Sequence, residues 1–541
     1  MTALVLANGA VFQGDAYLGA AAVGVEDGRV VATGSLKAVR EAVGPGAEEY
    51  DLQGGLLTAA FHDAHAHPVL AGMERLRCDL SELSTPEQYV AAVGDYADRF
   101  PDVEWIRGGG WNLAAFGPEG PTAAALDVVV PDRPVFLPAN DHHDAWVNSR
   151  ALELAGIDAR TPDPSDGWVL RDGEGRPTGT LREAAMSLVQ RHLPDTRADM
   201  YEGLLEAQRV VHGFGVVGWQ DALLGGYAGI DDPTVAYLIA LRTGTLTARV
   251  RGALWWDRHR GTEQVDELVG RREELREAGL DAGTVKIMVD GIAETFTAAM
   301  AEPYREVHRC PCGDRGLEFL GRDDLFAAVR AAHDADFQLH LHAIGDRAVH
   351  DALDALEQTG AAADPHRLRH HVAHLQFVAP EDRPRFAALG VTANIQGLWA
   401  NADDPAVEML RAHVGEERWS WQYPFGDLHR TGAGLAGGSD WPVDTPDPIQ
   451  AIHTLVNRRG FPVTEGSAPF LPDQAIDLEA AFRAHTSGAA WVSHDDESGM
   501  VRDGARADLA VLDRDPFTGP AEEIGAARVR ALFVGGTLVH S

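Results

Sequence analysis

Short apolar segments alternate with amphipathic ones from about residue 215 to residue 442, and this alternation constrains the fold more than any other feature. Seven of the apolar segments are predicted to be strands, over 215–222, 248–254, 284–291, 338–346, 369–377, 391–398 and 434–442. Amphipathic helix patterns lie between several of them, for example over 323–336 and 347–360. A first strand over 55–61, leading to Asp63, brings the number of units to about eight, which predicts an α/β fold with a (β/α)8 TIM-like barrel.

The chain is longer than one barrel needs, because a single hydrophobic core stops growing at roughly 250–300 residues and this chain has 541. Both ends are rich in short strands, with Asn8-Gly9 and Asp27-Gly28 as predicted hairpin turns. A stretch rich in Gly, Pro and Trp interrupts the alternation after the first strand. We therefore predict three domains: a β-sandwich from 1–57 plus 497–541, a barrel from 58–74 plus 209–496, and an inserted α+β domain over 75–208 that covers the active site.

The net charge of −36 argues against nucleic acid and anionic membrane as partners, because both are bound through basic surfaces. No apolar run approaches the roughly 20 residues that span a bilayer, and the N-terminal residues 1–15 lack the features of a signal peptide. Cys78, Cys310 and Cys312 are too few for a disulfide framework, so we predict a cytoplasmic protein. Cys310 and Cys312 follow His308 in what we interpret as a loop with two free thiols.

A metal site is indicated by His62-Asp63-Ala64-His65-Ala66-His67-Pro68, which follows the first predicted strand. In an extended chain, side chains at i and i+2 point the same way, so His65 and His67 can bind one metal ion. Imidazole suits zinc, and barrel active sites lie at the C-terminal ends of the strands. On its own the motif could equally be a solvated turn, so the assignment depends on further ligands.

Further candidate ligands lie at the ends of later strands. His342, His374 and Asp440 each occupy such a position, and a buried aspartate beside imidazoles can be a ligand, a proton shuttle or both. His340 and His370 are predicted to pack or to support the ligands rather than to bind metal.

Lys286 is one of only two lysines, with Lys37, in a chain that uses arginine at every other Lys/Arg position. It lies in an apolar strand, where a charged ammonium would be costly to bury. A neutral lysine amine can add carbon dioxide and become a carbamate that bridges two metals, and arginine cannot do this. The alternative is a lysine in an ion pair with Asp290.

Taken in chain order, the segments HDAHAHP, VKIMVDG, HLHAIGDRAV, HVAHLQ and GGSDWPV resemble the amidohydrolase superfamily. The resemblance is closest to amidohydrolase family 3, which includes enzymes like N-substituted formamide deformylase. Residues 131–157 and 173–185 are similar to the inserted domain of that family, and 499–516 are similar to the end of its β-sandwich.

The resemblance implies a metal-dependent hydrolase that cleaves an amide-type or formamide-type C–N bond of a small molecule by metal-activated hydroxide. It implies that His65 and His67 hold one metal, that His342 and His374 hold a second, and that Lys286 bridges the two as a carbamate. Asp440 would contact the first metal and shuttle the proton. The cofactor would be zinc, one or two ions per chain, and the pocket would be lined by Trp111, His143, Glu183, Phe296 and Gln396.

The sequence departs from the family pattern where the pocket is expected. A DGHA-like stretch has become Asp141-His142-His143-Asp144, and Ile292 to Phe296 replace a small polar run. After Gln396, Gly397-Leu398-Trp399 stand where Pro and His are expected. These changes preserve the proposed ligands and alter the predicted pocket lining.

Two other functions stay open at this point. One is a deaminase of the same superfamily with a single metal, although such enzymes carry a Glu shortly after the histidine that corresponds to His342, where this chain has Ala-Ile-Gly-Asp. The other is a non-catalytic binding protein on the same barrel. The sequence leaves the oligomeric state open, a homo-oligomer included.

Overall fold

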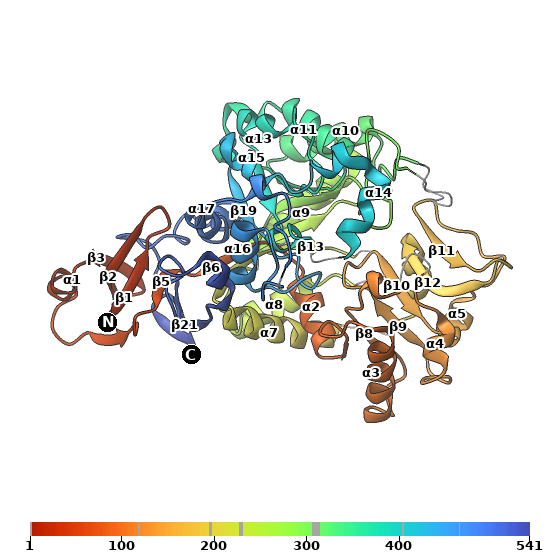
Figure 1. The fold of residues 1–541 in the computed structure, drawn as a ribbon, viewed down its shortest axis with the longest axis horizontal. Coiled ribbons are helices and arrows are strands. Elements are labelled where there is room, and N and C mark those ends of the chain that lie inside the picture. The colour runs from red at the N-terminus through yellow and green to blue at the C-terminus, as the bar shows by residue number, and fades with distance from the viewer. Residues whose placement is uncertain are drawn as a thin grey trace.

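The computed structural model describes residues 3–116, 120–193, 197–226, 231–305, 314–402, 405–464 and 466–541, without the side chains of 405–409. The fold is mixed α/β and contains three sheets. In Figure 1 the sheet built from the two chain ends lies at the left, the barrel in the centre and a third sheet at the right. Cys310, Cys312 and the loop predicted around them lie outside the described residues.

Eight parallel strands form the central sheet, and each is hydrogen-bonded to its neighbour in the order β19-β18-β17-β16-β15-β14-β13-β6. They are β6 (Phe61–Ala66), β13 (Val216–Leu224), β14 (Arg249–Trp255), β15 (Asp281–Met288), β16 (Gln338–Ala343), β17 (His371–His374), β18 (Thr392–Ile395) and β19 (Leu435–Gly437). The residues after β19 close the sheet, because Asp440 N donates to His65 O and His67 N donates to Trp441 O, both at 2.8 Å. The predicted parallel barrel is confirmed as a nearly closed one.

The start of the barrel differs from the prediction that its first strand covers 55–61. The structure divides this segment between β5 (Leu56–Ala59), which belongs to the sheet of the chain ends, and β6. The change of sheet occurs at neighbouring residues, since Ala60 N donates to Asp508 O and Phe61 N donates to Gly215 O. His65 therefore lies within the first barrel strand rather than after it.

Helices surround the barrel, and α11 (Asp346–Glu357) shows how such a helix buries one face. In α11 the buried apolar residues recur at intervals of one, three and four, as an amphipathic helix requires. The helices between or beside the barrel strands are α2 (Pro68–Arg75), α7 (Arg197–Gly213), α8 (Thr234–Thr243), α9 (Val265–Glu277), α10 (Arg322–Asp334), α11 (Asp346–Glu357), α12 (Pro365–Leu368), α13 (Arg383–Leu389), α14 (Pro405–Trp419), α15 (Phe425–Arg430), α16 (Pro448–Asn457), α17 (Leu478–Arg483) and α18 (Ala489–Val492). Among the described helices, none combines the length and apolar character that crossing a bilayer requires.

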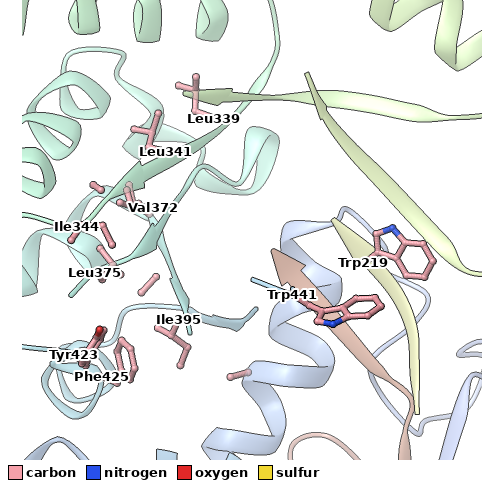
Figure 2. Packing of buried hydrophobic residues seen from close by; sticks show 14 of the residues in the cluster. Trp219, Leu339, Leu341, Ile344, Val372, Leu375, Ile395, Tyr423, Phe425 and Trp441 are labelled. Atoms are coloured by element: carbon pink, nitrogen blue, oxygen red, sulfur yellow. The ribbon is translucent and has the colours of Figure 1, made fainter. Parts of the chain in front are cut away.

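Strand β16 explains how the barrel separates its core from its site. Leu339 and Leu341 point to one face and pack in the main hydrophobic core, which Figure 2 shows in close-up. His340 and His342 alternate with them and therefore point to the barrel interior. The period of two along a strand thus assigns alternate residues to the core and to the functional site.

The chain ends together form one eight-stranded sheet: β1 (Ala3–Phe12), β2 (Tyr17–Glu26), β3 (Arg29–Gly34), β4 (Glu48–Asp51), β5, β20 (Leu509–Leu512), β21 (Val529–Val534) and β22 (Thr537–His540). α1 (Leu36–Val43) packs against it. Asp27-Gly28 forms the predicted hairpin turn between β2 and β3. The turn predicted at Asn8-Gly9 is wrong, because both residues lie within β1, where the pairing with β2 shifts register.

The third sheet lies in sequence between β6 and β13, in the order β11-β12-β10-β9-β8-β7. Its strands are β7 (Cys78–Asp79), β8 (Ile106–Gly109), β9 (Val135–Pro138), β10 (Asp144–Val147), β11 (Gly167–Arg171) and β12 (Pro177–Glu183). Its helices are α3 (Pro86–Arg99), α4 (Ala123–Asp127), α5 (Ser149–Ala155) and α6 (Ser187–Gln190). We call the residues from β7 to α6 the insert; the three domain boundaries stay a prediction.

Candidate metal centre and active site

Three predicted residues meet where the barrel closes. Nε2 of His65, on β6, and Nε2 of His67, at the start of α2, each lie 3.2 Å from Oδ1 of Asp440. The two backbone hydrogen bonds that close the barrel join these same segments. The arrangement brings together two imidazoles and one carboxylate that are about 375 positions apart in the sequence.

Three more predicted residues complete the group. The ring of His374 lies 4.7 Å from that of His65 and 4.5 Å from that of His342, centroid to centroid. Nζ of Lys286 lies 3.2 Å from Nε2 of His65. Six residues predicted from the sequence as metal ligands therefore face one another inside the barrel.

Two of these residues have strained backbones. His374 has a φ of 79° and Asp440 a φ of 57°, in the left-handed region that non-glycine residues rarely adopt. Oε1 of Gln396 accepts a hydrogen bond from His374 N at 2.8 Å and so supports this conformation. Such strain is retained where the surrounding structure fixes a side chain for a function.

The electrostatics of the site favour unprotonated over protonated nitrogen atoms in its histidines and lysine. Burial lowers the pKa of His65 to about 3, so its imidazole is neutral, and lowers the pKa of Lys286 to about 7, so a large fraction of the amine is neutral near pH 7. Burial alone would raise the pKa of Asp440, but His65, His67 and His374 hold it well below its usual value. The site thus offers neutral nitrogen donors around one ionised carboxylate.

Several of these donors are left without partners inside the protein. Among the described residues, both ring nitrogens of His374 and Nδ1 of His342 and His67 are buried and form no hydrogen bond. Donor atoms of His65, His374 and Asp440 lie within 4.8 Å of one another. Because buried polar atoms are normally satisfied, this donor set fits a divalent metal ion, and its imidazoles and carboxylate suit zinc.

A chain of hydrogen bonds behind His65 starts at Gln338, whose orientation is fixed. Its Nε2 donates to two backbone carbonyls, Arg369 O and Val492 O, both at 2.8 Å. Its Oε1 accepts from Arg251 Nε at 3.2 Å and from Thr284 Oγ1 at 2.6 Å. A guanidinium only donates and a carbonyl only accepts, so the amide of Gln338 cannot be reversed.

This orientation determines the position of the proton on His65. Gln220 Nε2 donates to Gln338 Oε1 at 3.1 Å, and Gln220 Oε1 therefore faces Nδ1 of His340 at 2.6 Å. Nδ1 of His340 must carry hydrogen, so its Nε2 accepts from Nδ1 of His65 at 2.9 Å. The chain leaves the lone pair of His65 on Nε2, the nitrogen beside Asp440. His340 thus supports a proposed ligand, in the role predicted for it.

Lys286 is not paired with Asp290, the alternative that the sequence left open. Asp290 accepts backbone hydrogen bonds from Ala299, Ile344 and Gly345 at 2.8–3.0 Å, and its Oδ1 lies 3.4 Å from Nδ1 of His342. Among the described residues, the hydrogen-bond partner of Lys286 is His65. His370 lies away from the group, bonded to His333 at 3.0 Å.

A cavity of about 110 Å³ opens beside these residues, between the barrel and the insert. It is smaller than the cavity of about 150 Å³ that holds benzene, so the enclosed space has room for only a small chemical group. Its apolar lining comes from both parts and includes Met186, Leu223, Trp255, Met288, Ile292 and Trp399. The ring of Trp399 stacks on that of His374, with centroids 5.2 Å apart and planes 8° apart.

Of the five residues predicted to line the pocket, His143 is part of the cavity wall. Its Nδ1 lies 2.9 Å from Oε1 of Glu183, which also accepts from Thr297 Oγ1 at 3.0 Å. Burial alone would lower the pKa of His143, but Glu183 outweighs it and raises the pKa to about 9. Glu183 thus holds a charged imidazolium at the cavity without lining it.

The other three predicted residues lie elsewhere. Trp111 is in the core of the insert, where its Nε1 donates to Leu137 O at 2.8 Å. Phe296 packs edge-on against the rings of Tyr304 and His413. Gln396 supports the backbone of His374, as described above. Each side chain is held by local packing or a backbone group that a reading of the sequence does not reveal.

Several cavity residues were not predicted, among them His142, Gln190, Trp255 and Trp399. A signal existed for two of them, because His142 and Trp399 lie where the sequence departs from the family pattern. For Gln190 and Trp255 the sequence offers no comparable signal.

Comparisons with known proteins agree with this geometry. A family model described as the amidohydrolase family matches residues 48–540. N-substituted formamide deformylase of Arthrobacter pascens is 28% identical over 535 residues, which cover 96% of this chain and 94% of that protein. The protein LONG AFTER FAR-RED 3 of Arabidopsis thaliana is 30% identical over 549 residues, which cover 99% of this chain and 91% of that protein. An uncharacterized metal-dependent hydrolase from Pyrococcus furiosus has a similar structure, with a TM-score of 0.70 and 26% sequence identity. The match covers 95% of this chain and 100% of that protein.

Proposed function

Because the chain belongs to the amidohydrolase family and is a metal-dependent hydrolase of non-peptide carbon–nitrogen bonds, we propose that it cleaves an amide or formamide bond of a small molecule in the cavity beside Asp440. The observation that carries the proposal is the group of neutral, unpartnered imidazole nitrogens around one ionised carboxylate. The identity of 28% to a formamide deformylase supports the substrate class.

His65 and His67 would hold one zinc ion, and His342 and His374 a second. Bound metal supplies a Lewis acid, which lowers the pKa of water from about 15.7 toward 7 and polarises a carbonyl. Lys286 would add carbon dioxide at the neutral form of its Nζ, forming an N–C bond and releasing one proton, and as a carbamate it would supply anionic oxygen ligands to the metal. The position of Nζ, 3.2 Å from Nε2 of His65, supports this role.

The protein residues would carry the proton and orient the substrate. Asp440 is ionised, as a general base must be, and would take a proton at its carboxylate from the attacking water. It would then deliver that proton to the leaving nitrogen, so that the C–N bond breaks and a neutral amine departs. His143, held charged by Glu183, would donate a hydrogen bond to the substrate, and Trp255, Leu223 and Trp399 would exclude water from the cavity.

Substitution of Asp440 by Asn tests the proposal. The variant should fold and retain metal but lose about 10²–10⁴-fold in kcat, measured on N-formyl, N-acyl and cyclic amides. Asp477→Asn is the matched control, because Asp477 caps α17 and Asn caps helices equally well. Near-normal turnover by Asp440→Asn would refute the assignment.

Metal content separates this proposal from the deaminase alternative. Two metals per chain would support the binuclear hydrolase, and one would support a mononuclear deaminase of the same superfamily. No metal in an active preparation would contradict both. The measurement is elemental analysis of protein dialysed at a fixed free zinc concentration.

We also propose the finer assignments that the sequence suggested. These are a cytoplasmic location, a small-molecule substrate without nucleic-acid or membrane partners, a β-sandwich formed by the two chain ends and an inserted domain over 75–208. The charge of −36 supports the absence of nucleic acid.

A further inference from the structure

His142 is a histidine in a backbone conformation suited to glycine. It lies in the turn between β9 and β10 of the insert with a φ of 60°, and its ring lines the cavity. Glycine adopts positive φ without steric cost and histidine does not, so the side chain is retained despite strain.

Glu74 lies behind His142. It is in α2, 7% exposed, and its Oε1 is 3.6 Å from Nε2 of His142. Neither atom has a hydrogen-bond partner among the described residues. Two buried polar atoms that face each other without other partners are costly unless they bond to one another.

The protonation of the pair follows from its surroundings. Burial raises the pKa of Glu74 well above 4.5, and burial lowers the pKa of His142 to about 3. A protonated carboxyl therefore faces a neutral imidazole at 3.6 Å, which is longer than a hydrogen bond, and the bond that would satisfy both atoms when this contact closes is Glu74 O–H donating to His142 Nε2. With that bond formed, the ring hydrogen of His142 is on Nδ1.

We infer that His142 is a substrate-binding residue of this chain, which donates its Nδ1–H to a hydrogen-bond acceptor on the substrate, and that Glu74 is the positioning residue that fixes this tautomer. The inference rests on the proposed function for its substrate class. His142 would select small amides that carry a second hydrogen-bond acceptor, placed near His67 and Asp440. A metal role is not indicated, because the three-donor cluster of the described residues comprises His65, His374 and Asp440.

Four variants test the inference: His142→Gly, Glu74→Met, Glu74→Gln and His142→Gly/Glu74→Met. Glycine removes the side chain and the strain together, and methionine removes the donor at similar size. Glutamine keeps a neutral donor for Nε2. His494→Gly is the matched control, since His494 also has a positive φ, 54°, and does not line the cavity.

The readouts are kcat and KM on amides with and without a second acceptor group, together with Tm. We expect kcat/KM for acceptor-bearing amides to fall about tenfold or more in His142→Gly and Glu74→Met, as for one lost substrate hydrogen bond. Glu74→Gln should stay within about threefold of wild type, and amides without the acceptor should be affected less. The double variant should have a Tm equal to or above that of wild type, because strain and a buried polar pair are both removed.

Three outcomes would overturn the inference. One is unchanged kcat/KM in His142→Gly while the wild type is active. Another is a Tm of the double variant several degrees below wild type, which would make the pair a stabilising device. The third is a Glu74→Gln variant as impaired as Glu74→Met. A wild type inactive on every amide refutes the proposed function instead, and the Tm comparison then still decides whether the pair is kept for stability.

Discussion

Replacing Gln220 by methionine should weaken metal binding through two histidines, although Gln220 contacts no proposed ligand directly. Gln220 Oε1 is the acceptor that keeps hydrogen on Nδ1 of His340, and His340 in turn keeps hydrogen on Nδ1 of His65. Without Gln220, His340 can take the other tautomer and turn a donor toward His65 Nδ1. His65 then moves its own hydrogen to Nε2 and loses the lone pair that faces the site.

The magnitude follows from which atoms lose their partners. In the variant, Gln338 Oε1 still accepts hydrogen bonds from Arg251 and Thr284, and Val492 O still accepts one from Gln338 Nε2. The group left unsatisfied is Nδ1 of His340, which costs about 1–3 kcal/mol of folding free energy. Loss of support behind a metal-binding histidine weakens metal affinity about 10–100-fold, equivalent to about 1.4–2.7 kcal/mol.

The assay is a competition titration of metal-free protein with zinc and a chromophoric chelator, alongside urea unfolding. Gln264→Met is the matched control, because Gln264 is also buried and bonded to backbone groups of Asp257, Arg260 and Gly261, yet has no link to the histidines. We expect both variants to lose stability and only Gln220→Met to lose affinity. Equal zinc affinity in the two variants would refute the proton arrangement derived for His65.

Two further predictions concern Lys286 and the pair His143–Glu183. Lys286→Ala should lower the zinc content about tenfold or more. Formate or acetate should restore part of the zinc content by standing in for the carbamate. Full activity of the variant without either anion would contradict the role of Lys286 as a bridging carbamate. His143 has its pKa raised from 6.5 to about 9 in the folded protein, so the pair stabilises the fold most below about pH 6.5 and loses this contribution as pH rises through 9. The stability difference between wild type and Glu183→Gln, from urea titrations at several pH values, should shrink over that interval; a pH-independent difference would contradict the assignment.

The barrel and the convergence of the candidate metal ligands could be predicted because both depend on short-range patterns. Strand–helix alternation requires only neighbouring residues, and residues at the C-terminal ends of parallel strands converge wherever the sheet closes. His65, His342, His374 and Asp440 follow from that rule, and Lys286 stands out as one of only two lysines, within an apolar strand of a chain that otherwise uses arginine. The error at the start of the barrel arose because residues 56–61 are apolar apart from Thr58, so no residue type marks the change of sheet between Ala59 and Phe61.

The surroundings of the site could not be predicted in the same way. Whether Trp111 faces a cavity or a core depends on which carbonyl its indole meets, and that carbonyl belongs to another strand. Gln220 and Gln338 are ordinary glutamines in sequence, and their role appears only once Arg251 and two backbone carbonyls fix their amides. Long-range hydrogen-bond orientation is a property of the assembled fold.

The sheet built from both chain ends has a consequence for biosynthesis. Leu56 and Leu57 of β5 pair with Leu512 and Val511 of β20, strands separated by nearly the whole chain. During translation β5 leaves the ribosome hundreds of residues before β20 exists, and its apolar edge stays unpaired for that time. Unpaired strand edges associate with one another, so a chain that stops short of β20 should aggregate, and the nascent chain should depend on chaperones until its last strands emerge.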